Sequence, residues 1–280
     1  TREVASVVKE LSPKADVYGP MFYSWSDMYM LNMDNYVAWN AIKSARGYWG
    51  FVDYYLDSLK NVEQEYGKRL LDVLSIHWYP EAKGTSTNLR IVDLIGTSTQ
   101  AQLTAPDMIT ARLQAPRSLW DETYIENSYL TSQHGALRLI KRLQNSINQY
   151  YPGTKLAFTE FKYDAEYHFS GGLALADVLG VFGREGVYMA SKWDPINNDF
   201  GGAAYKLYLN YNNEGGRFGN TSVRATTTNN AAISTFASLD ENNNLHVVVI
   251  NKTSSQQTTQ FGIANGYYSH GQVYGFDQTD

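Results

Sequence analysis

Residues 155–163 read Lys-Leu-Ala-Phe-Thr-Glu-Phe-Lys-Tyr and predict a short buried strand, bounded upstream by Pro152-Gly153. The apolar run stops at Glu160, so the strand delivers a carboxylate at its C-terminal end. Where parallel strands alternate with helices, active-site residues lie at that end of the strands. Glu160 is therefore the first candidate for chemistry, and the plain alternative is a solvated glutamate at a strand end.

The sequence around this strand alternates between strand and helix patterns. Further strands are predicted at 15–22, 71–79 and 187–193, and helical spacing of apolar residues at 4–11, 52–66, 136–147 and 171–183. This alternation is typical of a parallel α/β fold. A closed barrel needs eight such units in roughly 250 residues, whereas four are counted here in about 190.

The pattern changes after Gly201-Gly202. One helical stretch, 203–211, leads to a turn signal at 212–216, and short β-type runs follow at 222–227, 234–238, 245–250, 258–263 and 272–276. We therefore expect a partial barrel at 1–200 and an incomplete β-sandwich at 201–280. The segment 82–131 lacks a clear period and predicts a long functional loop that overhangs the site.

Composition excludes several classes of function. The 280 residues are only 18% charged with a net charge of −5, so no basic surface is available to recruit nucleic acid or anionic lipid. No apolar run is long enough to span a membrane, and no signal-peptide pattern is present. Apolar residues recur at helical spacing from Val4 onward, so we expect that the chain begins inside a domain. The absence of Cys excludes thiol catalysis. An aromatic content of 14% mildly favours a sugar ligand.

Cleavage of a glycosidic bond takes two carboxyl groups, which lie about 5–5.5 Å apart in retaining enzymes. Glu160 can supply one of them. Its partner is left open by spacing alone, because several acidic residues stand at or just after strand ends: Glu81, Asp164, Glu166 and Asp194.

His77-Trp78-Tyr79 places a titratable group and two aromatic rings at the end of another strand, and Trp193 ends a third. The histidine can hydrogen-bond a sugar hydroxyl or a catalytic carboxylate, while a structural histidine and core tryptophans are the plain alternatives. No second His lies at ligand spacing, so no metal site is predicted. Nucleotide-binding and serine-hydrolase motifs are absent.

Three segments together resemble glycoside hydrolase family 44, which comprises endo-acting β-1,4-glucanases and xyloglucanases built from a TIM-like barrel and a β-sandwich. They are Leu-Leu-Asp-Val-Leu-Ser-Ile-His-Trp-Tyr-Pro-Glu-Ala at 70–82, Gln-Ala-Pro-Arg-Ser-Leu-Trp-Asp at 114–121, and Phe-Thr-Glu-Phe-Lys-Tyr at 158–163 with His-Phe-Ser-Gly-Gly-Leu-Ala-Leu-Ala-Asp-Val-Leu-Gly at 168–180. The resemblance runs from about Val4 to Val249.

The resemblance implies roles for individual residues. Glu160 falls on the family's Thr-Glu nucleophile, and Trp78 and Trp193 fall near aromatic residues that line the glucan cleft. Sugar contacts are expected from His77, Trp78, Tyr79, Tyr163, Trp193 and Trp25. The implied partner is a β-1,4-glucan, the implied location is extracellular, and no cofactor is expected, although a structural calcium ion stays open.

The chain departs from the family at the acid/base residue. In the family this is a Glu in an Asn-Glu pair on the fourth barrel strand, whereas the only Asn-Glu here is Asn213-Glu214 in a Gly-flanked turn. We therefore expect residues 1–200 to be the C-terminal half of a barrel without its acid/base. Open strand edges then favour association, including with a second copy. The hypothesis is a retaining endo-glucanase part; its rivals are a non-hydrolytic glucan-binding protein and a locally replaced acid at Glu81 or Glu166.

Overall fold

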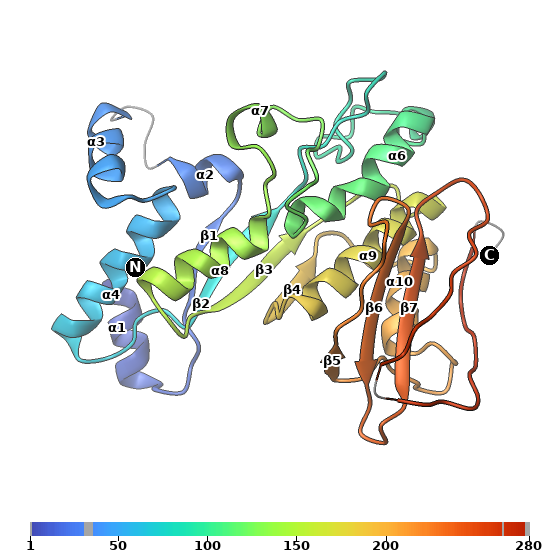
Figure 1. Cartoon of the computed structure of the whole chain (residues 1–280). Helices are drawn as coiled ribbons and strands as arrows, with labels where there is room; N and C mark the ends of the chain where they lie inside the picture. Colours follow the sequence, from blue (N-terminus) through green and yellow to red (C-terminus); the bar gives the residue numbers. More distant parts are fainter. Residues whose placement is uncertain (1, 31–35, 265, 278–280) are drawn as a thin grey trace.

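The computed structural model describes residues 2–30, 36–264 and 266–277. Its main sheet has four strands in the order β1 (Tyr18–Phe22), β2 (Val73–Trp78), β3 (Lys155–Phe161) and β4 (Met189–Lys192) (Figure 1). Each neighbouring pair is parallel. The parallel α/β arrangement predicted from the sequence is therefore confirmed.

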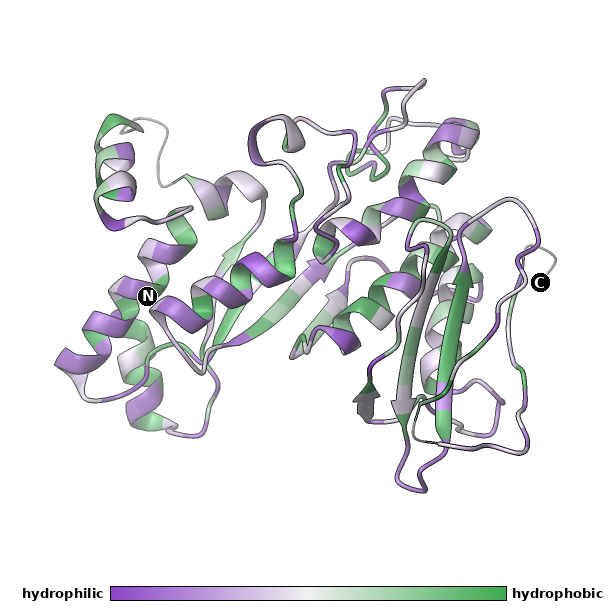
Figure 2. Ribbon diagram, in the orientation of Figure 1, coloured by the Kyte–Doolittle hydropathy of each residue, from purple (hydrophilic) through white to green (hydrophobic). Residues whose placement is uncertain are grey.

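Helices connect these strands and cover the sheet. The longer ones are α1 (Arg2–Leu11), α3 (Tyr36–Arg46), α4 (Phe51–Tyr66), α6 (Pro106–Gln114), α8 (Leu139–Tyr150), α9 (Phe169–Arg184) and α10 (Phe200–Leu209). Shorter ones are α2 (Trp25–Tyr29), α5 (Gln100–Leu103), the 3₁₀ helix η2 (Ala115–Leu119) and α7 (Thr131–His134). Figure 2 shows the apolar side of several of these helices turned toward the strands.

Helix α4 illustrates how local sequence fixes an element. Its buried residues Val52, Leu56 and Leu59 recur at helical spacing and form the face that packs inward. Gly67 ends the helix in the left-handed region, at φ 67°, where its N–H donates to the Glu63 carbonyl. The helix lies beside α8, so the two cover one face of the sheet together.

Helix α9 joins the main sheet to a second one. On one side, the ring of Phe182 lies 4.7 Å from Phe158 and 5.1 Å from Phe161, both on β3. On another side, Gly180 lies against the ring of Phe236 in the second sheet. That sheet is antiparallel, in the order β5 (Thr221–Val223), β6 (Ile233–Leu239) and β7 (Leu245–Asn251).

A buried ion pair crosses the same junction. Lys252, just after β7, places its Nζ 3.5 Å from Oδ2 of Asp177 on α9, and both side chains are almost fully buried. Burial raises the pKa of Asp177 against the opposing charge of Lys252, and burial likewise lowers the pKa of Lys252. Removing one partner alone leaves an uncompensated buried charge, so the two residues hold the junction as a unit.

Two expectations from the sequence need correction. Residues 258–263 and 272–276 form no strand, because their apolar side chains, such as Phe261 and Val273, lie exposed without a sheet face to bury. The second sheet of the described chain therefore has three strands instead of five. The segment 82–131 is also more regular than predicted, since α5, α6 and η2 lie within it.

The close approach of α9 to β6 yields a stability test. A methyl group added at Gly180 would lie 2.3 Å from a ring carbon of Phe236, whereas one added at Gly183, on the same helix, meets nothing within 4 Å. Gly180→Ala should lower the free energy of unfolding by about 1–3 kcal/mol through overpacking. Gly183→Ala should leave it unchanged or raise it by up to about 1 kcal/mol through helix propensity.

Denaturant unfolding of both variants measures the difference. Equal stability of the two would contradict the close packing of α9 on β6.

Candidate active site

The carboxyl ends of β2 and β3 bring the candidate catalytic residues together. The strands pair in register from Val73 to Ile76, after which the pairing shifts so that His77 lies opposite Glu160 and Thr159 has no partner across the ladder. An extra residue of this kind bends a strand and redirects its side chains, and such irregularities are common beside active sites. Here the shift places Glu160 next to His77.

Two side chains, one from β2 and one from the loop after it, lie against the Glu160 carboxylate. The hydroxyl of Tyr79 donates to Oε2 of Glu160 at 2.5 Å. Nδ1 of His77 lies 3.1 Å from the same oxygen but forms no hydrogen bond with it. Burial, then the hydrogen bond and charge of Glu160, raise the pKa of Tyr79, so the phenol stays a proton donor at neutral pH.

A small cavity of about 40 Å³ opens beside the His77 and Tyr79 side chains. Its lining includes His77, Trp78 and Tyr79, together with Trp25, Glu81 and Arg90. Four of the six predicted sugar-contact residues therefore line one cavity at the end of β2, together with one of the predicted alternative carboxylates, Glu81.

The predicted aromatic residues differ in how much of their surface is open. Trp193 is 48% exposed just beyond β4 and offers a ring to solvent. Trp78 and Tyr163 are 2% and 1% exposed. Trp25, the first residue of α2, is also buried, against the rings of Trp49 and His134. Of the five predicted aromatic residues, Trp193 alone is exposed, because Tyr79 is buried as well, at 7%.

Glu81 and Glu166 are both held by cations. Glu81 pairs with Arg90 at 3.0 Å, and Arg90 also donates to the Tyr79 carbonyl. Glu166 pairs with Lys192 at 3.0 Å. Burial raises the pKa of each glutamate more than its cation lowers it, so both have the electrostatic character of a group that can hold a proton.

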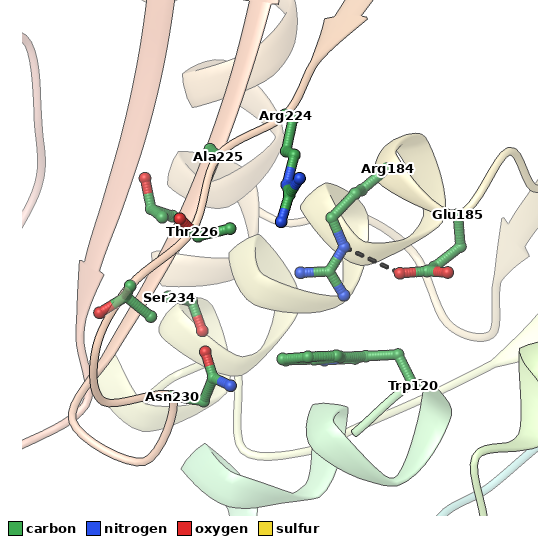
Figure 3. Close-up of a pocket in the computed structure, with 10 residues that line it drawn as sticks. Trp120, Arg184, Glu185, Arg224, Ala225, Thr226, Asn230 and Ser234 are labelled. Carbon is green, nitrogen blue, oxygen red and sulfur yellow. Dashed lines mark hydrogen bonds and ion pairs between the residues drawn. The ribbon is translucent and has the colours of Figure 1, made fainter. Parts of the chain in front are cut away.

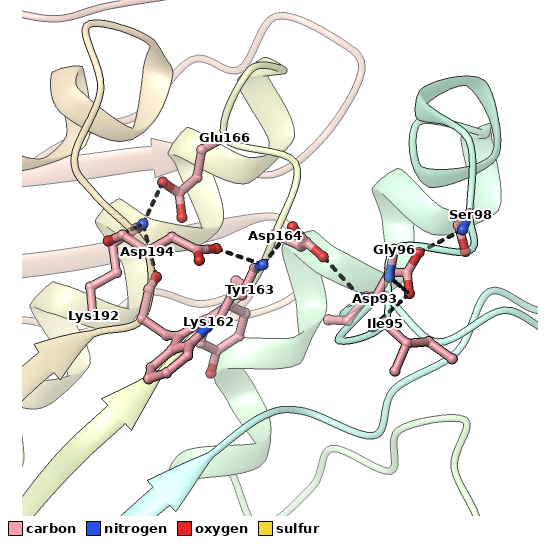
Figure 4. Close-up of polar contacts among 12 residues, drawn as sticks. Asp93, Ile95, Gly96, Ser98, Lys162, Tyr163, Asp164, Glu166, Lys192 and Asp194 are labelled. Carbon is pink, nitrogen blue, oxygen red and sulfur yellow. Dashed lines mark hydrogen bonds and ion pairs between the residues drawn. The ribbon is translucent and has the colours of Figure 1, made fainter.

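Asp164 and Asp194 share a cation. Nζ of Lys162 lies 2.6 Å from Oδ2 of Asp194 and 3.4 Å from Oδ1 of Asp164, and the other Asp164 oxygen accepts the backbone N–H of Asp93 (Figure 4). This network ties the loops after β3 and β4 to the segment 82–131. Both aspartates are engaged in structure, which makes them weaker candidates for proton transfer than Glu81 or Glu166.

Sequence reasoning missed the cations of the site. Lys162 and Lys192 each neutralise candidate carboxylates, and Arg90 fixes Glu81 to the loop after β2. Arg112 on α6 is fully buried and donates to the carbonyls of Tyr163 and Ile91. The position of Lys162, two residues after Glu160, was the one available signal, because a cation at a strand end beside several carboxylates predicts pairing.

The arrangement can support acid–base or nucleophilic chemistry at a carboxylate. Glu160 is 24% exposed, and the structure gives no hydrogen bond to its Oε1 from any described residue. Among the residues that the structure describes, no group of three or more His, Cys, Asp or Glu side chains is placed to hold a metal ion. Within the same ranges, no helix has both the length and the apolar character needed to cross a membrane.

Comparison with known proteins points to one family. A family profile described as glycoside hydrolase family 44 matches residues 1–82. Endoglucanase A of Paenibacillus lautus is 41% identical over 283 residues, which takes in 99% of this chain and 39% of that protein. The beta-mannanase/endoglucanase A of Caldicellulosiruptor saccharolyticus is 38% identical over 290 residues, covering 98% of this chain and 21% of that protein.

Solved structures agree with the sequence comparison. A family 44 endoglucanase from Clostridium thermocellum matches with a TM-score of 0.79 and 40% identity, over 89% of this chain and 47% of that one. A family 44 xyloglucanase from Paenibacillus polymyxa, solved with xyloglucan, matches with a TM-score of 0.79 and 39% identity, over 90% and 48% of the two chains. The chain thus spans about half the length of these solved structures.

The shared cation of the network gives a pH-dependent prediction. Burial opposes the charge of Lys162, but the hydrogen bond to Asp194 and the charges of both aspartates raise its pKa above the ordinary 10.5. The folded state therefore holds this proton more tightly than the unfolded state does. Its stabilising contribution is complete below the ordinary pKa and is lost as the pH rises through the folded pKa.

Lys162→Met should lower the free energy of unfolding by about 1–3 kcal/mol at pH 8, and the difference from the unmodified protein should shrink as the pH rises above the ordinary lysine pKa of 10.5. Lys206→Met is the matched control, because Lys206 is exposed on α10 and pairs with no acid among the described residues. Denaturant unfolding at the two pH values measures both. A Lys162→Met effect that stays constant with pH would refute the role given to the ion pairs.

Proposed function

Because the chain belongs to glycoside hydrolase family 44, we propose that it contributes the nucleophile, Glu160, to the retaining hydrolysis of β-1,4-glucans. The observation that carries this proposal is the setting of the Glu160 carboxylate. One oxygen accepts a hydrogen bond from Tyr79 and lies 3.1 Å from Nδ1 of His77, while the other is left without a hydrogen bond from the described residues. A carboxylate fixed through one oxygen presents the second in a constant direction, as attack on a substrate carbon requires.

In the proposed first step, Oε1 of Glu160 forms a bond to the anomeric carbon while the bond from that carbon to the leaving oxygen breaks. A carboxylic acid gives its proton to the leaving oxygen. In the second step the same group, now a carboxylate, takes a proton from water, and the water oxygen displaces Glu160 from the sugar. Two carboxyl groups thus complete the cycle without a cofactor.

We propose that the acid/base is supplied from outside these 280 residues, by a partner fold that completes the barrel. Apolar side chains on the β1 side of the sheet support this, since Val4 and Leu11 of α1 are 69% and 81% exposed and Met21 of β1 is 57% exposed. Such surface is normally covered. The solved relatives, about twice as long, have the chain length for a second half. The same edge could pair with a second copy of this chain.

On this proposal the chain divides near residue 200. The part before it belongs to the barrel, and the part after it belongs to a sandwich that further strands would complete. The relatives are an endoglucanase and a xyloglucanase bound to xyloglucan, so the proposed substrate is a β-1,4-glucan backbone, met outside the cell. Trp193 would offer its open ring to a sugar.

A locally replaced acid is the alternative within the same chemistry. Glu81 and Glu166 have the raised pKa that a general acid needs, and Glu81 lines the cavity that also holds Tyr79. Hydrolysis by the 280-residue chain alone, lost on Glu81→Gln or Glu166→Gln, would favour this alternative over an external acid.

Glu160→Gln tests the nucleophile. In the complete enzyme it should lower the rate of reducing-end release from carboxymethylcellulose and xyloglucan by roughly 10³-fold or more, because an amide cannot form the glycosyl ester. Glu214→Gln is the matched control, since Glu214 stands exposed in the Asn-Glu turn and should keep full activity. Activity of the Glu160 variant near the unmodified level would remove the assignment.

Tyr79→Phe tests how the nucleophile is held. The change removes one charge-assisted hydrogen bond to Oε2 and keeps the ring, so kcat should fall by about 10–100-fold while the fold persists. Steady-state kinetics on xyloglucan, with circular dichroism as the folding control, measures the effect. An unchanged kcat would show that the Tyr79 contact does not position the carboxylate for reaction.

A further inference from the structure

A second cavity, far larger than the first, lies at the junction of the two sheets. Its volume is about 300 Å³, near the lower end of small-molecule sites. The end of α9, the end of η2 and the segment between β5 and β6 enclose it (Figure 3). None of its lining residues lines the cavity beside Glu160. The proposed hydrolysis therefore gives it no role.

Trp120 and Arg184 form one wall of this cavity. The guanidinium of Arg184 stacks on the Trp120 ring, 4.1 Å from its centre, and its Nε donates to Glu185 at 2.8 Å. Its Nη2 is buried and has no hydrogen-bond partner. Arg184 is thus held in place by the Trp120 ring and by Glu185.

Arg224 brings a second guanidinium to the same space. Figure 3 shows its side chain directed toward Arg184, over the Trp120 ring. The structure gives Arg224 no ion pair or hydrogen bond with any described residue. Nearby cations are matched, Arg184 with Glu185, Lys252 with Asp177 and Arg117 with Asp121, whereas Arg224 has no ion pair within the part of the chain that the structure describes.

Glu185 lines the same cavity and already compensates the charge of Arg184, so Arg224 is the guanidinium that an added anion would compensate. Planar forks of N–H groups match a carboxylate through paired hydrogen bonds. The remaining wall carries hydroxyl and amide groups, from Thr226, Thr227, Asn230 and Ser234, beside an aromatic ring. Such groups suit the hydroxylated edge and the apolar face of a sugar ring.

We propose that this cavity binds a sugar carboxylate, the uronic acid class, with Arg224 on the acid group and the Trp120 ring as the aromatic wall of the site. We further infer that this uronic acid is a branch of a cell-wall polysaccharide, and this part of the inference rests on the proposed function. The binding itself does not, because it uses residues separate from Glu160 and involves no bond cleavage.

The test is a titration of the 280-residue chain with free D-glucuronic acid, followed by calorimetry and tryptophan fluorescence. D-glucose is the neutral control and inorganic phosphate is the competing anion. A single ring with one ion pair should bind at about millimolar affinity. Arg224→Gln should weaken binding about tenfold, while Arg217→Gln, which removes an exposed arginine outside the cavity, should leave it unchanged.

Saturable binding of glucuronic acid that follows this pattern, with no binding of glucose, supports the site. No saturation by the folded chain, equal binding of glucose, or equal effects of Arg224→Gln and Arg217→Gln would overturn it. Tighter binding of phosphate than of glucuronic acid would overturn the carboxylate assignment. Each result is read from binding alone, without hydrolysis, so the outcome for this cavity is independent of whether Glu160 acts as the nucleophile.

Discussion

The pairing of β2 with β3 is the constraint on which the site depends. Parallel pairing brings residues 81 positions apart, Tyr79 and Glu160, to the same edge of the sheet, and the unpaired Thr159 moves Glu160 opposite His77. The hydroxyls of Ser75 and Thr159 meet at 2.6 Å just below this shift and help to fix it. Without that register, a carboxylate at the end of β3 would be one solvated glutamate among several.

The rest of the fold keeps this edge in place through packing on α9. Phe182 packs on β3, Gly180 admits the ring of Phe236 from β6, and Asp177 pairs with the buried Lys252. One helix therefore links the strand that carries Glu160 to the second sheet. The same junction creates the arginine-lined cavity, because Arg184 stands at the end of that helix.

Much of the parallel fold could be predicted because its signals are local. The apolar spacing of 52–66 and 171–183 and the apolar run 71–79 reappear as α4, α9 and β2. Helix α6 escaped prediction because one of its inward side chains is Arg112, a charge that satisfies backbone carbonyls in the core instead of facing water. The runs 258–263 and 272–276 have strand-like composition but no sheet face to cover, which composition alone does not reveal. The ion pair between Lys162 and Asp194 could not be predicted either, because it depends on how the loops after two different strands lie relative to each other.

The central claim is that Glu160 bonds to the sugar, and covalent trapping tests it most directly. A 2-deoxy-2-fluoro β-cellobioside with a dinitrophenolate leaving group needs little acid assistance, so it can react even where the acid is absent. After incubation with the 280-residue chain, peptide mass spectrometry should find the glycosyl group on Glu160 and none in Glu160→Gln. A label on Glu81 or Glu166 instead, or a folded chain that takes no label, would contradict the account.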